Sequence, residues 1–236
     1  MGAIYKREIK SYFTTMVGYI YMAIFFLVSA FFFMRYTVQA GENADVSSYF
    51  TIILYLFVVI IPLITMKLVS EERKMKTDQL LLTSPVSLWG MMIAKFLAAF
   101  TLFGSAFLIS SLIYYIPLAT YGSPNFAIYA GSVFAILLVG MAFISIGIFI
   151  SSLTENQFIA AFGTIASIVI LLMIDQVSSF INSEFIRTVI SNISVTSRYA
   201  NFAKGIFDYA SLFYFISISA LFLFLSVRVF EKRRWS

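Results

Sequence analysis

Cysteine and histidine are both absent from the 236-residue chain. Their absence excludes disulfide bonds, thiolate nucleophiles, zinc sites built from Cys and His, and acid–base catalysis by imidazole. Charge is also scarce, because only 11% of the residues are Asp, Glu, Lys or Arg, against about 25% in an ordinary soluble domain. The chain therefore resembles neither a disordered protein nor a typical soluble enzyme.

Hydrophobic residues make up 61% of the sequence, whereas soluble domains hold about 45–50%. A folded chain of this size still exposes roughly a quarter to a third of its surface. In water, a chain of this composition would therefore expose a large and unfavourable apolar area. The composition indicates an integral membrane protein. A net charge of +5 would also suit nucleic-acid binding, but the positions of the basic residues favour the membrane, and no nucleic acid is expected.

Long runs without a charged residue mark the membrane spans, and they cover 11–34, 46–66, 96–154, 156–174 and 209–227. One helix needs about 20 apolar residues to cross the bilayer. The run 96–154 must therefore hold two helices, and Pro117, Gly122 and Pro124 place a turn between them. We expect an all-α integral membrane protein forming one domain, residues 1–236, with six transmembrane helices at approximately 14–34, 49–67, 93–117, 126–152, 157–175 and 209–229.

The basic residues predict the orientation of these spans. With six spans both termini lie on one side, and that side carries twelve basic residues: Lys6, Arg7, Lys10, Lys67, Arg73, Lys74, Lys76, Lys95, Arg228, Lys232, Arg233 and Arg234. The other side carries four: Arg35, Arg187, Arg198 and Lys204. Because basic residues collect on the cytoplasmic side, both termini are predicted to be cytoplasmic.

Residues 1–13 precede the first span, and their apolar and charged positions form a pattern. Apolar and aromatic residues fall at helical spacing, namely Tyr5, Ile9, Tyr12, Phe13 and Met16, with Lys6, Arg7, Glu8 and Lys10 between them. The pattern favours an amphipathic helix in the cytoplasmic interface. The alternative is a solvated basic segment that only sets the topology.

The loop 67–87, between the second and third spans, has the densest charge in the chain, followed by Leu80, Leu81 and Leu82. Three consecutive leucines should not lie in water. Thr77 and Asp78 can cap a helix, and Ser84 followed by Pro85 is typical of the start of the next helix. We expect a short helix whose apolar face either binds a cytoplasmic partner or dips into the lipid interface.

The loop 175–208, between the fifth and sixth spans, lies on the outer side. One apolar stripe recurs every four residues from Val177 to Ile193, and a second holds Tyr199, Phe202, Ile206 and Tyr209. The stripes predict two short amphipathic helices, lying on the outer leaflet or re-entering the protein. Long patterned loops often form lids or gates, and the candidate gate residues are Arg198, Phe202, Gly205 and Asp208.

Several chemistries are disfavoured by what the spans contain. No acidic residue lies away from the span ends, which argues against a proton-driven carrier and an intramembrane protease. No Gly is followed by Lys, so the chain has no Walker A loop for ATP.

Small residues in the fourth and fifth spans allow close helix contact, either within the subunit or at a dimer interface. They are Gly140, Ser145, Gly147 and Gly163.

Three segments resemble the permease subunit of type-2 ABC exporters, most closely the gliding-motility-like and nitrous-oxide-maturation-like branch. Residues 5–13 resemble the elbow helix of that family, residues 70–87 its coupling-helix loop, and residues 202–215 the segment before its last span. The resemblance covers essentially the whole chain. One departure is Lys76, where many relatives have Gly before the Thr.

The resemblance implies how the work is divided among subunits. Two cytoplasmic ABC ATPase subunits would bind ATP and Mg²⁺, while this chain holds no catalytic residue, metal or cofactor. The chain would pair with a second copy or a sibling permease in a bacterial plasma membrane, and this branch often adds a membrane protein with an extracellular domain. The implied elbow residues are Tyr5, Glu8, Tyr12 and Phe13, and the implied ATPase-coupling residues are Glu71, Glu72, Arg73, Thr77, Asp78, Leu80, Leu81, Leu82 and Pro85.

These features are compatible with two functions. The first is the permease of an ATP-driven exporter, whose apolar pathway suits amphipathic peptides, lipids or drugs. The second is a membrane anchor or mechanical scaffold that uses an ATPase without moving a solute.

The predicted topology can be tested by cysteine labelling, because the chain has no native cysteine to react. In intact cells, a cysteine introduced by Ser183→Cys should react with an impermeant thiol reagent, since residues 175–208 are expected outside. One introduced by Ser236→Cys should react only after the membrane is opened. The opposite labelling pattern would contradict the six-span orientation.

Overall fold

The computed structural model describes residues 1–38, 46–77, 87–121, 125–178, 188, 190 and 192–234. All of the regular structure in these residues is helical. The elements are α1 (Gly2–Thr14), α2 (Val17–Phe33), the π-helix η1 (Met34–Val38), α3 (Val46–Thr65), α4 (Ser70–Lys74), α6 (Leu88–Tyr121), α7 (Phe126–Leu153), α8 (Gln157–Ser178), α10 (Val195–Ala203) and α11 (Tyr209–Arg234). In the described part of the chain, six helices are long and apolar enough to cross a membrane, which confirms the prediction of six spans.

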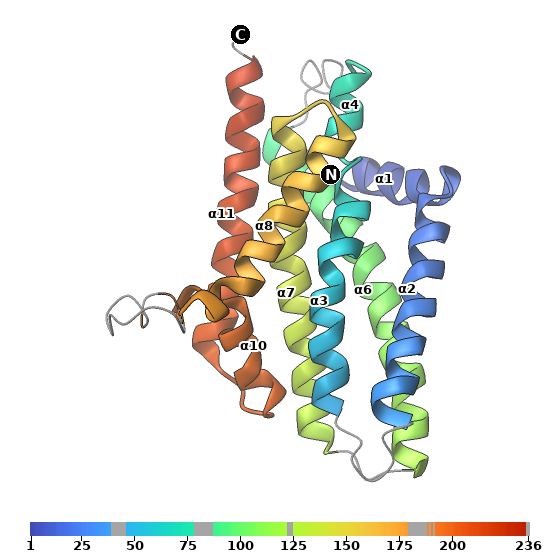
Figure 1. Ribbon diagram of the computed structural model, residues 1–236. Helices are drawn as coiled ribbons and strands as arrows, with labels where there is room; N and C mark the ends of the chain where they lie inside the picture. The colour runs from blue at the N-terminus through green and yellow to red at the C-terminus, as the bar shows by residue number, and fades with distance from the viewer. Residues whose placement is uncertain are drawn as a thin grey trace.

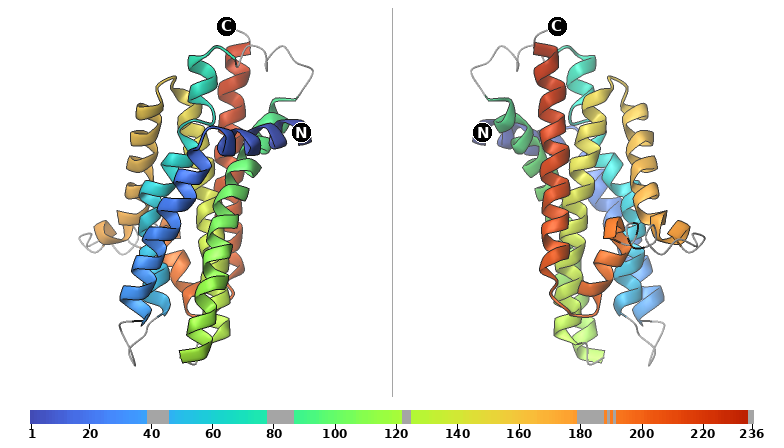
Figure 2. Two further views of the ribbon diagram at one scale, coloured as in Figure 1. Left: turned by 90° about the vertical axis from the view of Figure 1, so that its right-hand side faces the viewer. Right: turned by 90° about the vertical axis from the view of Figure 1, so that its left-hand side faces the viewer.

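The spans form an elongated bundle, and the shorter helices are attached to it (Figure 1). Helix α1 lies across the bundle, nearly perpendicular to α2, and the two helices meet at Met16, whose φ is 58°. Helices α1 and α4 and the C-terminal end of α11 all lie toward the same end of the bundle, and the turned views agree (Figure 2). We call this the α4 end and the opposite one the far end.

Helix α7 lies at the centre of the bundle. In its most apolar window 67% of the residues are buried, against 22% for α8 and 28% for α2. Helix α7 therefore contacts other helices on most of its sides, whereas α2 and α8 leave wide apolar faces open to lipid. This difference is expected when all spans are equally apolar, because lipid tails solvate such side chains as well as a protein core does.

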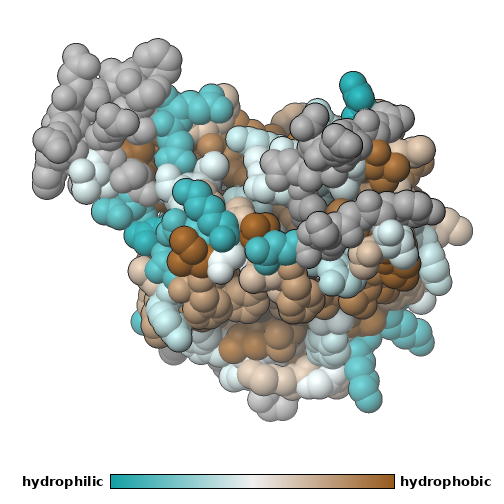
Figure 3. Space-filling model, turned by 90° about the horizontal axis from the view of Figure 1, so that it is seen from below, coloured by the Kyte–Doolittle hydropathy of each residue, from teal (hydrophilic) through white to brown (hydrophobic). Residues whose placement is uncertain are grey.

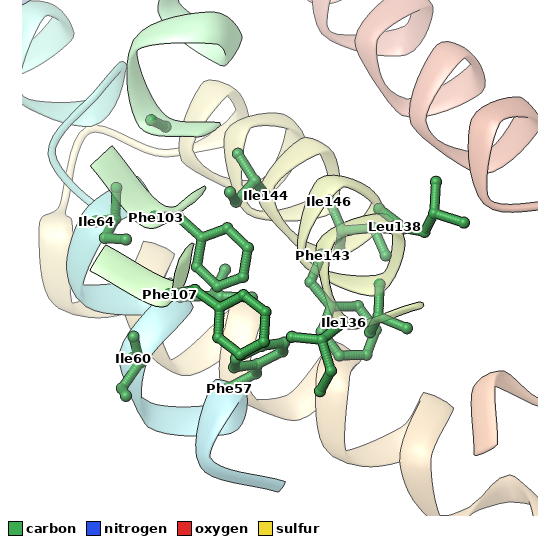
Figure 4. Packing of buried hydrophobic residues seen from close by; sticks show 14 of the residues in the cluster. Phe57, Ile60, Ile64, Phe103, Phe107, Ile136, Leu138, Phe143, Ile144 and Ile146 are labelled. Atoms are coloured by element: carbon green, nitrogen blue, oxygen red, sulfur yellow. The ribbon is translucent and has the colours of Figure 1, made fainter. Parts of the chain in front are cut away.

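Aromatic rings fill the space between α3, α6 and α7 (Figure 4). The ring of Phe103 on α6 stacks with that of Phe107 at 6.2 Å, and meets the edge of Phe57 on α3 at 5.1 Å. All three side chains are fully buried. Such pairs contribute about 0.5–1.5 kcal/mol each beyond the burial of their surface.

Glycines on α7 let its neighbours approach closely. A Cβ placed on Gly140 would lie 2.2 Å from Cε1 of Phe103, and one on Gly147 would lie 2.4 Å from Oγ1 of Thr65. On α8, a Cβ on Gly163 would lie 2.9 Å from Cγ2 of Ile150. These small residues therefore serve helix packing within the subunit, as one of the two sequence interpretations proposed.

Helix α6 extends beyond the predicted span 93–117 at both ends, because charge-free runs mark apolar composition and not the ends of a helix. Its C-terminal part contacts α2, where the hydroxyl groups of Tyr114 and Ser29 lie 2.8 Å apart. The ring of Tyr114 also stacks on Phe33 at 4.5 Å. Helix α6 is thus attached to α2 near the far end of the bundle.

We expect Gly140→Ala to destabilise the protein, because the added methyl group overlaps the ring of Phe103 and the packed core leaves that ring little room to move. Overpacking of this kind costs about 1–3 kcal/mol. Gly104→Ala is the matched control, since the nearest atom, Cδ2 of Leu137, would lie 3.8 Å from the new Cβ. Thermal denaturation in detergent measures both, and equal melting temperatures for the two variants would contradict the packing described here.

Candidate functional site

A buried ammonium group lies at the α4 end of the bundle, where α1, α4 and α6 meet. Lys95 of α6 is fully buried, and its Nζ lies 3.1 Å from Oε1 of Glu8 and 2.9 Å from Oε1 of Glu72. Arg7 lies beside both carboxylates, with Nη2 2.6 Å from Glu8 and 2.7 Å from Glu72. We call these four side chains the Lys95 network, and its two positive and two negative charges balance.

The local backbone explains why the ammonium group is stable there. Lys95 also donates a hydrogen bond of 2.8 Å to the carbonyl oxygen of Leu68. Leu68 lies in the turn between α3 and α4, where regular helical hydrogen bonding is interrupted and carbonyl groups are free to accept other donors. A buried charge with two carboxylates and a carbonyl as partners is satisfied, whereas removing one partner of a buried pair typically costs 3–5 kcal/mol.

The same turn is also attached to α7. The hydroxyl of Ser151 accepts hydrogen bonds from the backbone N–H groups of Val69 (3.3 Å) and Ser70 (3.1 Å), and donates one to the carbonyl of Met66 (3.2 Å). These bonds satisfy backbone groups that the break between α3 and α4 leaves without helical partners.

Arg73 of α4 reaches the link between α7 and α8. Its Nη1 donates to the carbonyl of Ser152 at 3.0 Å, and its Nη2 pairs with Glu155 at 3.3 Å. Arg233, near the end of α11, donates to the same Ser152 carbonyl at 3.0 Å. Helix α4 is therefore held by Glu72 on the side of α1 and α6, and by Arg73 on the side of α7 and α11.

The four residues predicted for the elbow helix all contact other helices. The hydroxyl of Tyr5 lies 3.0 Å from Oγ1 of Thr101 on α6, and that of Tyr12 donates to the carbonyl of Ile64 on α3 at 3.2 Å. The ring of Phe13 meets Tyr19 on α2 at 5.4 Å. Glu8 fell with the charged positions in the sequence pattern, yet it is buried because it belongs to the Lys95 network.

Helix α4 ends in a Schellman motif. The N–H of Thr77 bonds to the carbonyl of Glu72 at 3.0 Å, and the N–H of Lys76 bonds to that of Arg73 at 3.1 Å. The motif requires a left-handed residue after the helix, and Lys76 adopts φ = 56°. Glycine is the usual residue there because a side chain makes this conformation costly. The departure noted in the sequence therefore falls on a position whose backbone favours glycine.

The structure describes only part of the predicted coupling segment. It brings Glu72 and Arg73 into the contacts above, and the hydroxyl of Thr77 donates to the carbonyl of Glu72 at 3.2 Å. Glu71 has no ion pair among the described residues. Asp78, Leu80, Leu81, Leu82 and Pro85 lie outside the described residues. Sequence reasoning missed Lys95, Ser151, Ser152 and Glu155. The one available signal was that Lys95 is a lone charge at the edge of a long apolar run.

In the connection between α8 and α11, α10 is hydrogen-bonded to α8 and packs on α7. Ser194 caps α10 by accepting a hydrogen bond from the N–H of Ser197 at 3.1 Å, and its hydroxyl donates to the carboxylate of Asp175 on α8. The hydroxyl of Ser197 lies 3.1 Å from both oxygens of Asp175. A Cβ on Gly131 of α7 would lie 2.6 Å from the carbonyl oxygen of Phe202, so the two helices touch through their backbones.

The four candidate gate residues lie on α10 and on the connection from α10 to α11. Phe202 is buried, with its ring 5.9 Å from that of Phe134 on α7, while the guanidinium of Arg198 lies 5.5 Å from the centre of the ring of Tyr214 on α11. Gly205 has φ = 75°, which allows the chain to turn after α10. Residues 179–187, 189 and 191, which hold most of the first predicted stripe, lie outside the described residues.

Asp208 caps the first turn of α11. One of its carboxylate oxygens accepts from the N–H of Ala210 at 2.9 Å, and the other from Ser211 at 2.6 Å and Asn201 at 3.1 Å. The hydrogen bond from the Ser211 hydroxyl, followed by that from Asn201, lowers the pKa of the Asp208 carboxyl, although slight burial opposes the shift.

Viewed from the far end, hydrophilic residues gather across part of the face and hydrophobic residues form much of the rest (Figure 3). In the part of the chain that is described, no group of three or more acidic residues could hold a metal ion.

The comparison with protein families gives one match. Residues 3–235 match the family model described as ABC-2 family transporter protein. No curated protein matches the chain.

Replacing Lys76 by glycine should stabilise the protein, because glycine adopts the left-handed conformation without the cost of about 1 kcal/mol that a side chain adds. Lys74→Gly is the matched control. It places glycine in the last turn of α4, where it should destabilise by roughly 0.5–1 kcal/mol. The melting temperatures in detergent should therefore shift in opposite directions, and a shift in the same direction for both variants would contradict this assignment.

Proposed function

The chain belongs to the ABC-2 transporter family, and from that premise we propose that it is the permease subunit of an ATP-driven exporter. In this proposal the chain provides the membrane pathway and couples it to a separate cytoplasmic ATPase. The gliding-motility-like and nitrous-oxide-maturation-like branch is the narrower proposal. It rests on the resemblance of residues 5–13, 70–87 and 202–215.

The observation that carries the proposal is the attachment of α4 on two sides. The segment 78–86 follows α4 after the turn at residues 75–77, and it bears the leucines proposed to bind the ATPase. Any movement of that segment is passed to Glu72, and through the Lys95 network to α1 and α6. The same movement is passed to Arg73, and through Ser152 and Glu155 to α7 and α8. A docking loop attached in this way can shift several spans together.

The leucine segment itself has the properties of a docking element. Three apolar side chains follow a run of charged residues of both signs and precede Thr83 and Ser84. A polar border around an apolar centre is expected when the centre is buried in a partner and the border orients it. The proposed coupling residues are Glu71, Glu72, Arg73, Thr77, Asp78, Leu80, Leu81, Leu82 and Pro85. Glu72 and Arg73 would transmit the movement, and the leucines would make the contact.

The rest of the assembly follows from the same proposal. Two ABC ATPase subunits would bind ATP and Mg²⁺, because this sequence contains no Walker A loop. A second copy of the chain or a sibling permease would complete the pathway, and a membrane protein with an extracellular domain can join it. The α4 end would face the bacterial cytoplasm, since most of the basic residues were assigned to that side.

On the far side, α10 is the proposed gate. It is short, lies against α7 and is joined to α8 through Asp175. Its contacts with α7 involve a backbone approach at Gly131 and the ring of Phe202. A small shift of α7 against α8 would therefore move α10, together with Arg198, Gly205 and Asp208 around it.

Placing a charge in the leucine segment should prevent docking, because burying an unpaired charge in an apolar groove costs several kcal/mol. We expect at least one of the variants Leu80→Asp, Leu81→Asp and Leu82→Asp to lose the ATPase during purification of the tagged chain. Membrane insertion should be unchanged, since the site lies outside every span. The copurified partner is identified by photolabelling with an azido-ATP analogue and by its ATP hydrolysis.

Lys95→Met tests the second step of the same mechanism. This variant should retain the ATPase but lose the ATP-dependent change in thiol reactivity of a cysteine introduced by Ile206→Cys, a position that is 59% exposed near α10. Lys74→Ala is the control, because Lys74 is exposed and an ion pair of an exposed side chain contributes only about 0–1 kcal/mol to stability.

The proposal fails if all three aspartate variants bind the ATPase normally. An ATP-dependent compound flux across vesicles separates the exporter from the scaffold.

A further inference from the structure

A cavity with several charged side chains in its wall lies beside the Lys95 network, where α1 turns into α2. Its volume is about 220 Å³, and its lining includes Ser11, Val17, Lys67 and Glu71 as well as members of the network. Val17 is the first residue of α2 and of the first candidate membrane span. The cavity therefore opens at the level where apolar span gives way to polar surface, which is the level of lipid headgroups.

Two charged side chains in the cavity wall have no ion pair within the described residues. Arg7, Glu8 and Glu72 are committed to the Lys95 network. Lys67 and Glu71 also line the cavity, and neither lies within 4.0 Å of an opposite charge in the part of the chain that is described. The cavity thus offers one cation and one carboxylate, both half-buried, for a ligand that carries both signs of charge.

The charge balance around the cavity favours a neutral ligand. The lining holds two cations, Arg7 and Lys67, and three carboxylates, Glu8, Glu71 and Glu72. Lys95 does not line the cavity, but its ion pairs with Glu8 and Glu72 bring the sum of these charges to zero. An anionic headgroup would add an unpaired negative charge to this partly desolvated site, which is costly. A zwitterion can place its phosphate near Lys67 and the hydroxyl of Ser11, and its ammonium near Glu71, without changing the balance.

Hydrogen bonding separates two kinds of zwitterionic headgroup. A primary ammonium carries N–H groups that donate to a carboxylate, and such charge-assisted hydrogen bonds are among the strongest in proteins. A quaternary ammonium has no N–H group and can only approach the carboxylate as a diffuse charge. A carboxylate such as Glu71 therefore selects a primary ammonium.

The surface of α2 supplies a place for acyl chains. Ile20, Ile24 and Leu27 are exposed and recur at spacings of four and three, so they lie on one face of the helix. By the 3.6-residue helical repeat, the centre of that face lies about one-sixth of a turn from Val17, which lines the cavity. Figure 1 shows α2 running away from α1 along the bundle, so a chain attached to a headgroup in the cavity can lie along this stripe.

We propose that this cavity binds the headgroup of a phosphatidylethanolamine-type lipid, with the phosphate held by Lys67 and Ser11 and the primary ammonium by Glu71. The site goes beyond the proposed transport function, since it concerns a resident lipid and needs no ATPase. The lipid would fill the corner between α1, α2 and α4 that the Lys95 network leaves open.

The test uses the full chain in nanodiscs that contain equal amounts of phosphatidylethanolamine, phosphatidylcholine and phosphatidylglycerol with identical acyl chains. After release into detergent, native mass spectrometry counts the lipids retained. We expect phosphatidylethanolamine to be enriched over phosphatidylcholine, and the enrichment to fall roughly tenfold in Lys67→Met and in Glu71→Gln, as loss of one charge-assisted hydrogen bond implies. Lys10→Met is the matched control, because Lys10 is an exposed cation of α1 that does not line the cavity.

A series of headgroups with zero to three N-methyl groups tests the same site without any variant. Retention should fall as N–H donors are lost, most steeply at the quaternary amine. Equal retention of phosphatidylcholine, preferred retention of phosphatidylglycerol, or an unchanged preference in both variants would each overturn the proposal. Displacement of the lipid by low concentrations of free phosphoethanolamine would also overturn it, because the site would then serve a soluble ligand.

Discussion

The burial of one ammonium group constrains much of the α4 end of this protein. Lys95 cannot lie unpaired among apolar helices, because an isolated buried charge is far more costly than most folding contributions. Its partners come from separate parts of the chain: Glu8 from α1, Glu72 from α4 and the Leu68 carbonyl from the turn between α3 and α4. The position of α1 across the bundle and the interruption between α3 and α4 are therefore linked, since changing either would remove a partner from Lys95.

The central helix provides the opposite kind of constraint. Helix α7 contacts its neighbours through glycines that leave no space, at Gly140 against Phe103, Gly147 against Thr65 and Gly131 against the backbone of α10. Closely packed contacts of this kind are not continuously deformable, so relative motion takes the form of rigid-body shifts between packed groups. The Lys95 network attaches α6 to α1 and α4 at the α4 end, whereas the backbone contact at Gly131 attaches α7 to α10.

The six spans could be predicted because each depends on a property of its own residues, the absence of charge over a sufficient length. The helical nature of residues 2–14 followed in the same way from local spacing. The Lys95 network could not be predicted, because positions 8, 72 and 95 meet only through tertiary folding and each alone looks like an ordinary cytoplasmic charge. Ser151 and Ser152 were equally hidden, because they are small polar residues near the end of α7 whose partners lie in distant parts of the chain. Lys76 lies between these cases: the family resemblance pointed to the position, but only the backbone angle gives the reason.

Helix α6 is 34 residues long, which corresponds to about 51 Å at a rise of 1.5 Å per residue. A hydrocarbon core of about 30 Å needs far less. The same helix carries Lys95 and Thr101, which contact α1, and Tyr114, which contacts α2 from two turns before its other end. Helix α6 therefore acts as a stiff rod with a contact to the N-terminal helices near each end. If such a rod tilted about its contact with α1, the displacement would grow with distance along it and would be felt where the hydroxyl of Tyr114 meets that of Ser29. A tilt of this kind would carry movement from one end of the bundle toward the other with no change in the internal structure of the helix.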